Sequence, residues 1–305
     1  MKKKLIALAV AGALAAPVVA SAQGTNVTIF GRVQAEYSGV DNGNTPYQAS
    51  LQDNARSSRW GLQISEDLGR GLKAIARLEQ SLNTGTGLAT TAREQWVGLS
   101  GNNFGEVKFG RVQSPFKDFA GGMTIDPFAY TTLQANGAGG TMTGSANGMG
   151  SGANSFVNSA IRFDSLNVEG FSFAGILMPG DANQFDPANT TLGALINPSN
   201  QGAMGNTGGK DGEFDGQAAG KYTTNYMGHD LSVFGGYSRD NANVNMKAIG
   251  LRAEETWRVG GTWKYENFSL VGQYERVTNA LGAASCSNGA ALSAMPTGGA
   301  FNPTG

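Results

Sequence analysis

The chain has 305 residues, and its 46 glycines are about twice the share of roughly 7% found in average proteins. Only 40% of the residues are hydrophobic, whereas a soluble domain of this size normally buries more aliphatic side chain. The 22 basic and 23 acidic side chains give a formal net charge of −1, so nothing in the charge suggests nucleic acid or an anionic lipid surface as a partner. The single cysteine, Cys286, excludes an internal disulfide.

Residues 1–22 have the composition of a Sec-type signal peptide. Lysines at 2–4 precede an apolar run over 5–16, and the small residues at 20–22 predict cleavage before Gln23. The remaining chain has no run of eighteen apolar residues, which excludes a helical membrane protein. We therefore expect an exported protein whose residues 23–305 form one β-barrel domain.

From residue 25 onward, apolar and polar residues alternate in segments that are joined by short turns at one end and longer loops at the other. Successive side chains of a strand point to opposite faces, so each segment predicts a strand with one apolar and one polar face. The expected strands, about eleven in all, are 25–37, 59–65, 72–80, 93–100, 106–111, 160–164, 171–178, 217–226, 231–238, 256–265 and 268–276. Such a series of hairpins is typical of an all-β, antiparallel outer-membrane barrel.

The hairpin 256–276 shows the two faces most clearly. Its polar face carries Arg258, Lys264 and Glu275, which we expect to meet channel water, while the aromatic face meets lipid or a neighbouring subunit. Aromatic residues of this kind form girdles at the two membrane interfaces. The girdle candidates are Tyr37, Trp60, Trp96, Trp257, Trp263 and Tyr265. The alternative, core packing in a soluble sandwich, is weaker because the opposite faces carry too many charges for a second buried layer.

Two connections, 112–158 and 179–215, are far longer than ordinary loops, which rarely exceed about 12 to 15 residues without a function. The first begins with aromatic and acidic residues that could pack inside a barrel. Its second half is rich in glycine, alanine, methionine and threonine.

Several motifs in their order resemble the trimeric general porins of Gram-negative bacteria. These motifs are VTIFGRV at 27–33, SRWGL at 58–62 with EDLGRGLKA at 66–74, REQWVGL at 93–99, FGR at 109–111 and SAIRFDS at 159–165. The resemblance implies a sixteen-stranded, water-filled barrel that assembles as a homotrimer among outer-membrane lipids. It also implies passage of ions and small hydrophilic solutes, with the loop 112–158 folded inward to narrow the channel.

Proteins of this kind carry basic side chains on the barrel wall, facing acidic residues of the inward loop. The basic ladder implied here consists of Arg32, Arg59, Arg93 and Arg162 by local motif, with Arg77 by alternation alone. Asp118 and Asp126 are the candidate acidic counterparts. Opposed rows of charge would create a transverse field that selects solutes by size, charge and dipole. Alternatively, each arginine is only a solvated or salt-bridged residue of the lumen.

The resembled proteins end in a strand whose last residue is aromatic, whereas this chain ends Asn-Pro-Thr-Gly at 302–305. We therefore expect a C-terminally truncated member, with about five further strands following residue 276 in the full-length protein.

Other functions receive little support from the sequence. A non-conducting surface barrel or adhesin, binding through its long loops, is the alternative to a channel. An outer-membrane hydrolase would need a serine–histidine pair, but His229, the only histidine, falls in a short turn. We expect no catalytic residues, no metal site and no cofactor.

Overall fold

The computed structural model describes residues 25–40, 48–53, 57–85, 87–131, 156–179, 214–241 and 252–279. The signal peptide expected at 1–22, Cys286, the tail after 279 and most of the connection 179–215 lie outside these ranges. None of the helices in the described ranges has the length and apolar character needed to cross a membrane.

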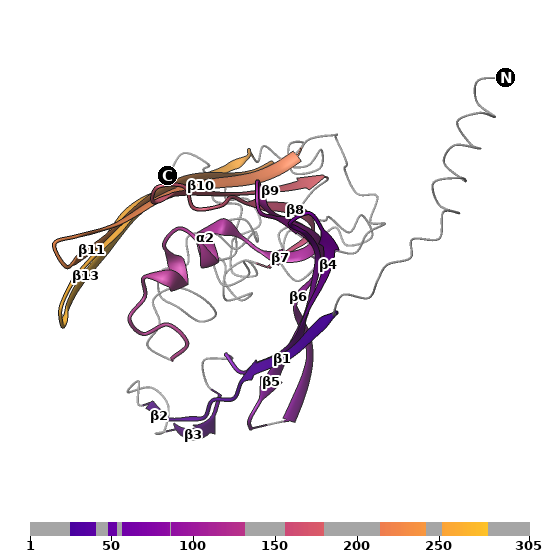
Figure 1. The fold of residues 1–305 in the computed structure, drawn as a ribbon. Helices are drawn as coiled ribbons and strands as arrows, with labels where there is room; N and C mark the ends of the chain where they lie inside the picture. Colours follow the sequence, from indigo (N-terminus) through magenta and orange to yellow (C-terminus); the bar gives the residue numbers. More distant parts are fainter. Residues whose placement is uncertain are drawn as a thin grey trace.

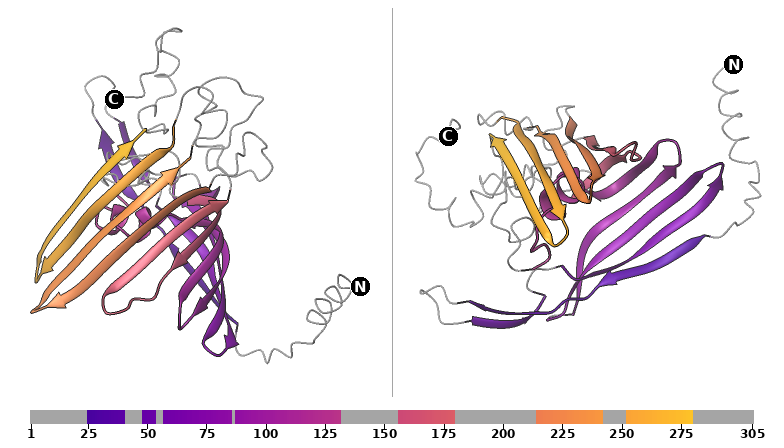
Figure 2. Two further views of the ribbon diagram at one scale, coloured as in Figure 1. Left: turned by 90° about the horizontal axis from the view of Figure 1, so that it is seen from above. Right: turned by 60° about the vertical axis from the view of Figure 1, so that its left-hand side comes forward.

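A single antiparallel sheet of eleven strands dominates the described residues, in the order β1-β4-β5-β6-β7-β8-β9-β10-β11-β12-β13. Its strands are β1 (Asn26–Arg32), β4 (Arg59–Gly69), β5 (Leu72–Asn83), β6 (Gly87–Gly101), β7 (Gly105–Gln113), β8 (Phe156–Asp164), β9 (Phe171–Pro179), β10 (Phe214–Tyr226), β11 (His229–Asp240), β12 (Glu254–Tyr265) and β13 (Phe268–Thr278). The sheet curves like a barrel wall, with β1 and β13 at its two edges (Figure 1; Figure 2). The all-β class and the predicted hairpins are confirmed.

The first strand differs from its prediction. β1 ends at Arg32, and the chain then forms β2 (Glu36–Val40), which pairs with β3 (Gln48–Gln52) in a separate two-stranded sheet. A single strand over 25–37 is therefore wrong, and Tyr37 lies outside the eleven-stranded sheet. The ladder between β1 and β4 ends at the Arg32–Arg59 pair, and the backbone N–H of Gln34 donates to the Ser58 hydroxyl at 2.9 Å.

Alternation along the strands separates an outer from an inner face. Outward side chains such as Ile29, Val259 and Tyr274 are 76%, 57% and 65% exposed, which suits an apolar surrounding. The inner, concave face carries the charged residues and both buried apolar clusters. The short helices α2 (Pro115–Asp118) and η1 (Gly122–Thr124) lie inside the curve (Figure 1).

Candidate functional site

Residues 114–131, here called the inner loop, follow β7 and cover part of the concave face (Figure 1). Pro115 opens α2, where its fixed φ suits a first helical position. Phe116 is 0% exposed and packs in a cluster with Ala120, Ala219 and Phe234. Gly236 leaves room for it, because a Cβ there would lie 2.4 Å from the Phe116 ring. The described part of the long connection 112–158 thus lies against the inner wall.

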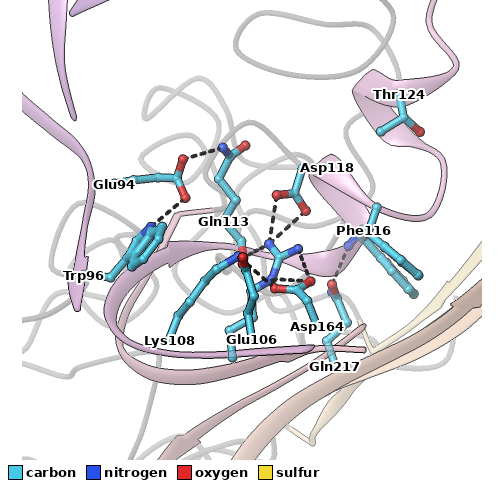
Figure 3. Close-up of polar contacts among 12 residues, drawn as sticks. Glu94, Trp96, Glu106, Lys108, Gln113, Phe116, Asp118, Thr124, Asp164 and Gln217 are labelled. Carbon is cyan, nitrogen blue, oxygen red and sulfur yellow. Dashed lines mark hydrogen bonds and ion pairs between the residues drawn. The ribbon is translucent and has the colours of Figure 1, made fainter. Parts of the chain in front are cut away.

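Arg162 on β8 joins the inner loop to the wall. Its guanidinium lies 2.8 Å from the Asp118 carboxylate of the loop and 2.7 Å from Asp164 on its own strand. Asp118 and Asp164 are labelled in Figure 3. Arg162 also donates to the backbone carbonyl of Gln113 at 2.8 Å. The loop acid Asp118 therefore contacts the basic ladder directly. The carboxylate of the second candidate, Asp126, accepts the backbone N–H of Phe128 at 2.9 Å.

Three further arginines of the ladder converge on a wall carboxylate, Glu79 of β5. The side chain of Glu79 is 1% exposed, and its oxygens lie 2.6 Å from Arg77 and 3.8 Å from Arg59. Arg93 also donates to Glu79 through Nε. Arg77 makes a second ion pair with Glu94 on β6, at 3.2 Å. The wall itself thus supplies the main counter-charges of these arginines.

A β-bulge in β6 explains why Arg93 reaches Glu79. The register pairs Leu78 with Gln95 and Gln80 with Ala92, so two residues of β6 stand opposite one residue of β5. Such a bulge disturbs strict alternation and re-aims side chains. Arg93 and its neighbour Glu94 both turn to the concave side, where each has polar partners.

The same bulge changes the orientation of Trp96. Because Glu94 faces inward, Trp96 two residues later also faces inward, and it is only 6% exposed. Its ring nitrogen donates to Glu94 at 3.1 Å, and the Lys108 ammonium lies 5.2 Å from its ring centre (Figure 3). The assignment of Trp96 to a membrane girdle is therefore wrong.

Aromatic rings of the inner loop contact three cations of the wall. The guanidinium groups of Arg32 and Arg59 lie 4.3 and 5.0 Å from the ring centre of Tyr130. On β10, the Lys221 ammonium lies 4.4 Å from the ring centre of Phe119. A ring face attracts a cation without neutralising it, so these contacts position positive charge while preserving it.

Lys117 is a buried cation of the inner loop. Its ammonium lies 3.5 Å from the ring centre of Phe156. Burial, reinforced by the positive charge of Arg93, lowers the pKa of Lys117 to about 7, although Asp118 acts in the opposite direction. A cation that titrates near neutrality therefore lies beside the basic ladder.

Arg258 does not face channel water, contrary to its prediction. Its side chain is 0% exposed, because α2 covers it, and it pairs with Glu275 at 2.7 Å. Alternation placed both residues correctly on the inner face, but the inner loop shields them from the lumen.

The remaining girdle candidates of the main sheet project outward. Trp60 and Trp257 are 41% and 57% exposed near the strand ends that join the longer connections. Trp263 and Tyr265 lie at the opposite strand end and stack with His229, whose ring is 4.3 Å from that of Tyr265.

Sequence reasoning missed Glu79, Glu94 and Lys117 as members of this site. Simple alternation from Arg77 could have identified Glu79, which is two residues away on the same strand face. Glu94 and Lys117 gave no comparable signal, since their positions depend on the bulge and on the loop. In the described ranges, no three histidine, cysteine or acidic residues are grouped so as to hold a metal ion.

Known proteins resemble this chain along most of its length. The family model described as Gram-negative porin matches residues 7–302. An outer membrane porin protein of Bordetella pertussis is 27% identical over 302 residues, covering 92% of this chain and 70% of that protein. Outer membrane porin protein 32 of Delftia acidovorans is 44% identical over 121 residues, covering 38% of this chain and 33% of that protein.

Among solved structures, an anion-selective porin from Comamonas acidovorans shares the fold. It superposes with a TM-score of 0.58 at 22% identity, over 85% of this chain and 70% of its own. The chain belongs to the Gram-negative porin family and is a protein of the outer membrane.

Proposed function

We propose that the protein forms a water-filled channel through which ions and small hydrophilic solutes diffuse passively. The observation that carries this proposal is the inner loop, which contacts the concave wall at widely separated strands. The loop contacts β8 through the Asp118–Arg162 ion pair. It contacts β1 and β4 through the ring of Tyr130, which lies against the guanidinium groups of Arg32 and Arg59. A loop held across the inner face narrows a lumen.

The selectivity of the channel would follow from the charges beside this loop. We propose that the basic ladder and the loop acid Asp118 set the field across the constriction, with Glu79 as an additional counter-charge from the wall. Charged rings and the width of a constriction are the usual determinants of channel selectivity. Arg32, Arg59, Arg77 and Arg93 would attract anions, and Asp126 would add negative charge from the loop.

The outer face would contact lipid and neighbouring subunits. We propose that Trp60 and Trp257 belong to one aromatic girdle and Trp263 and Tyr265 to the other, since each pair lies near one end of the strands. A homotrimer is the proposed assembly, as in the family to which the chain belongs.

Conductance and reversal potential in planar bilayers test the proposal, using protein purified from outer membranes. The parent should conduct, and neutral replacement of Arg59 and Arg93 should shift its reversal potential toward cation selectivity, because positive charge leaves the constriction. A conducting double variant with an unchanged reversal potential would contradict the role of the ladder. Absence of any conductance would instead favour the alternative, a non-conducting surface or adhesin barrel.

A further inference from the structure

Arg258 on β12 contacts both the barrel wall and the inner loop that lies above it. Its Nε and Nη2 atoms lie 2.8 and 2.7 Å from the Glu275 carboxylate of β13. Its Nη1 donates to the backbone carbonyls of Phe116 and Ala120, the latter at 2.9 Å. The guanidinium also lies 4.3 Å from the centre of the Phe116 ring. One side chain therefore binds the wall on one side and the loop on the other.

Of the two carbonyls that Arg258 binds, that of Phe116 belongs to α2 and that of Ala120 lies two residues beyond the end of the helix. The last carbonyls of a helix have no partner within the helix, and a basic side chain near this end satisfies them and complements the helix dipole. Because α2 is a single turn, Pro115–Asp118, it has little stability of its own. Its position must therefore depend on contacts from the wall.

Two glutamines, one on β10 and one on β13, also bind the backbone of the loop, as acceptors rather than donors. Gln217 of β10 accepts the backbone N–H of Phe116 at 2.6 Å, and Gln273 of β13 accepts that of Gly122 at 2.9 Å. Both contacts, like those of Arg258, are made to backbone atoms of the loop. They therefore fix the path of the loop and leave its exposed side chains to the lumen.

We propose that Arg258, oriented by Glu275, is a positioning residue that latches the inner loop to β10–β13 and thereby sets the free cross-section of the channel. The proposal rests on the proposed channel function, since only a conducting lumen has a cross-section that solutes sense. Arg258 itself is shielded from the lumen, so its influence on permeation acts through the loop.

Lysine can replace arginine here only in part. The planar guanidinium can bind a carboxylate, two carbonyls and a ring face together, whereas an ammonium is a compact point charge with three donors. The variant Arg258→Lys should therefore restore some of the function that Arg258→Met loses. Such a graded series separates a latch from a simple requirement for positive charge.

Solute-size discrimination in proteoliposomes is the first readout. In Arg258→Met, the uptake rate of a large sugar relative to a small one should rise by about two- to five-fold, with Arg258→Lys between this variant and the parent. Gln217→Leu removes a backbone contact without changing charge and should shift the ratio in the same direction. Lys264→Met, on the same strand, removes an equal charge at an exposed position and should retain the parent ratio.

Hydrogen exchange of the backbone amides at 114–124 is the second readout, because it does not require conduction. Exchange there should accelerate by about tenfold in Arg258→Met while the strand amides remain protected. A folded Arg258→Met protein with parental exchange and parental size discrimination would overturn the latch. If the parent protein fails to conduct but loop exchange still accelerates, the channel function fails and the latch stands. If Arg258→Met does not fold, the same two measurements on Gln217→Leu decide the question.

Discussion

Replacing Glu79 by glutamine is the most direct test of how charge is distributed in the constriction. Glu79 is the shared partner of Arg59, Arg77 and Arg93, and its side chain is 1% exposed. Glutamine has nearly the same shape but no charge. The change therefore removes one negative charge, which makes the net charge of the lumen more positive by one while preserving packing.

The expected size of the effect follows from Coulomb's law. For a permeating ion in water about 10 Å from the carboxylate, one unit charge contributes about 0.4 kcal/mol, and screening at 0.1 M salt reduces this to about 0.15 kcal/mol. Cations and anions are affected in opposite directions, so the anion-to-cation permeability ratio should rise by about two- to four-fold. The fold should lose about 3 kcal/mol, near the lower limit for a broken buried pair, because the arginines remain 12–28% exposed.

Reversal potentials in a salt gradient measure the permeability ratio. Glu79→Asp retains the charge and should remain close to the parent. Glu169→Gln removes an equal charge from an exposed turn and serves as a control for net charge far from the ladder. A folded, conducting Glu79→Gln channel with the parental permeability ratio would refute the reasoning.

Three further predictions concern the inner loop and the turns. Below a pH of about 7 Lys117 gains its proton, so the parent should become more anion-selective as the pH falls from about 8 to about 6, and Lys117→Met should lose this dependence in reversal-potential measurements. Phe116→Ala should destabilise the protein by about 3–5 kcal/mol in urea unfolding, because the ring is 0% exposed. Gly105→Ala should cost about 1–3 kcal/mol, since its φ is +103° and a Cβ would lie 2.1 Å from a backbone carbonyl, whereas Gly272→Ala meets no atom within 4 Å and should cost less.

Sequence periodicity identified the strands because outward and inward side chains face different surroundings. The hairpin 256–276 is the clearest case, and its register pairs Trp257 with Arg276 and Tyr265 with Phe268, both on the outer face. Alternation is a local pattern, so it predicts which face of a strand a residue occupies without knowledge of the rest of the fold. Alternation also placed Arg258 and Glu275 correctly on the inner face.

The errors arose where a single residue shifts the register or where a distant segment covers the wall. Strict alternation from an inward Arg93 puts Trp96 on the outer face, but the bulge turns Glu94 inward and Trp96 with it. The burial of Arg258 depends on a loop about 140 residues away in sequence, with contact separations of 142 and 138. Neither effect leaves a periodic signal in the sequence.

The inner face of the sheet has two parts with different roles. On β10–β13, small residues such as Ala219, Gly236 and Gly260 leave space for Phe116 and Phe234, so this part receives the loop. On β4–β8, arginines and carboxylates pair with one another. The loop carboxylate of Asp118 joins this second part through Arg162.

Aromatic contacts decide how much positive charge remains available to a solute. A carboxylate offsets the field of one paired arginine, so Glu79 offsets only part of the charge of Arg59, Arg77 and Arg93, whereas an arginine stacked on a ring keeps its full charge. Arg32 stacks on Tyr130 and Lys221 on Phe119, and in both cases the ring belongs to the inner loop. The loop thus holds cations in place without cancelling them. The rings of the loop therefore preserve the positive charge of the wall, whereas the Asp118 carboxylate, which binds Arg162, offsets part of it.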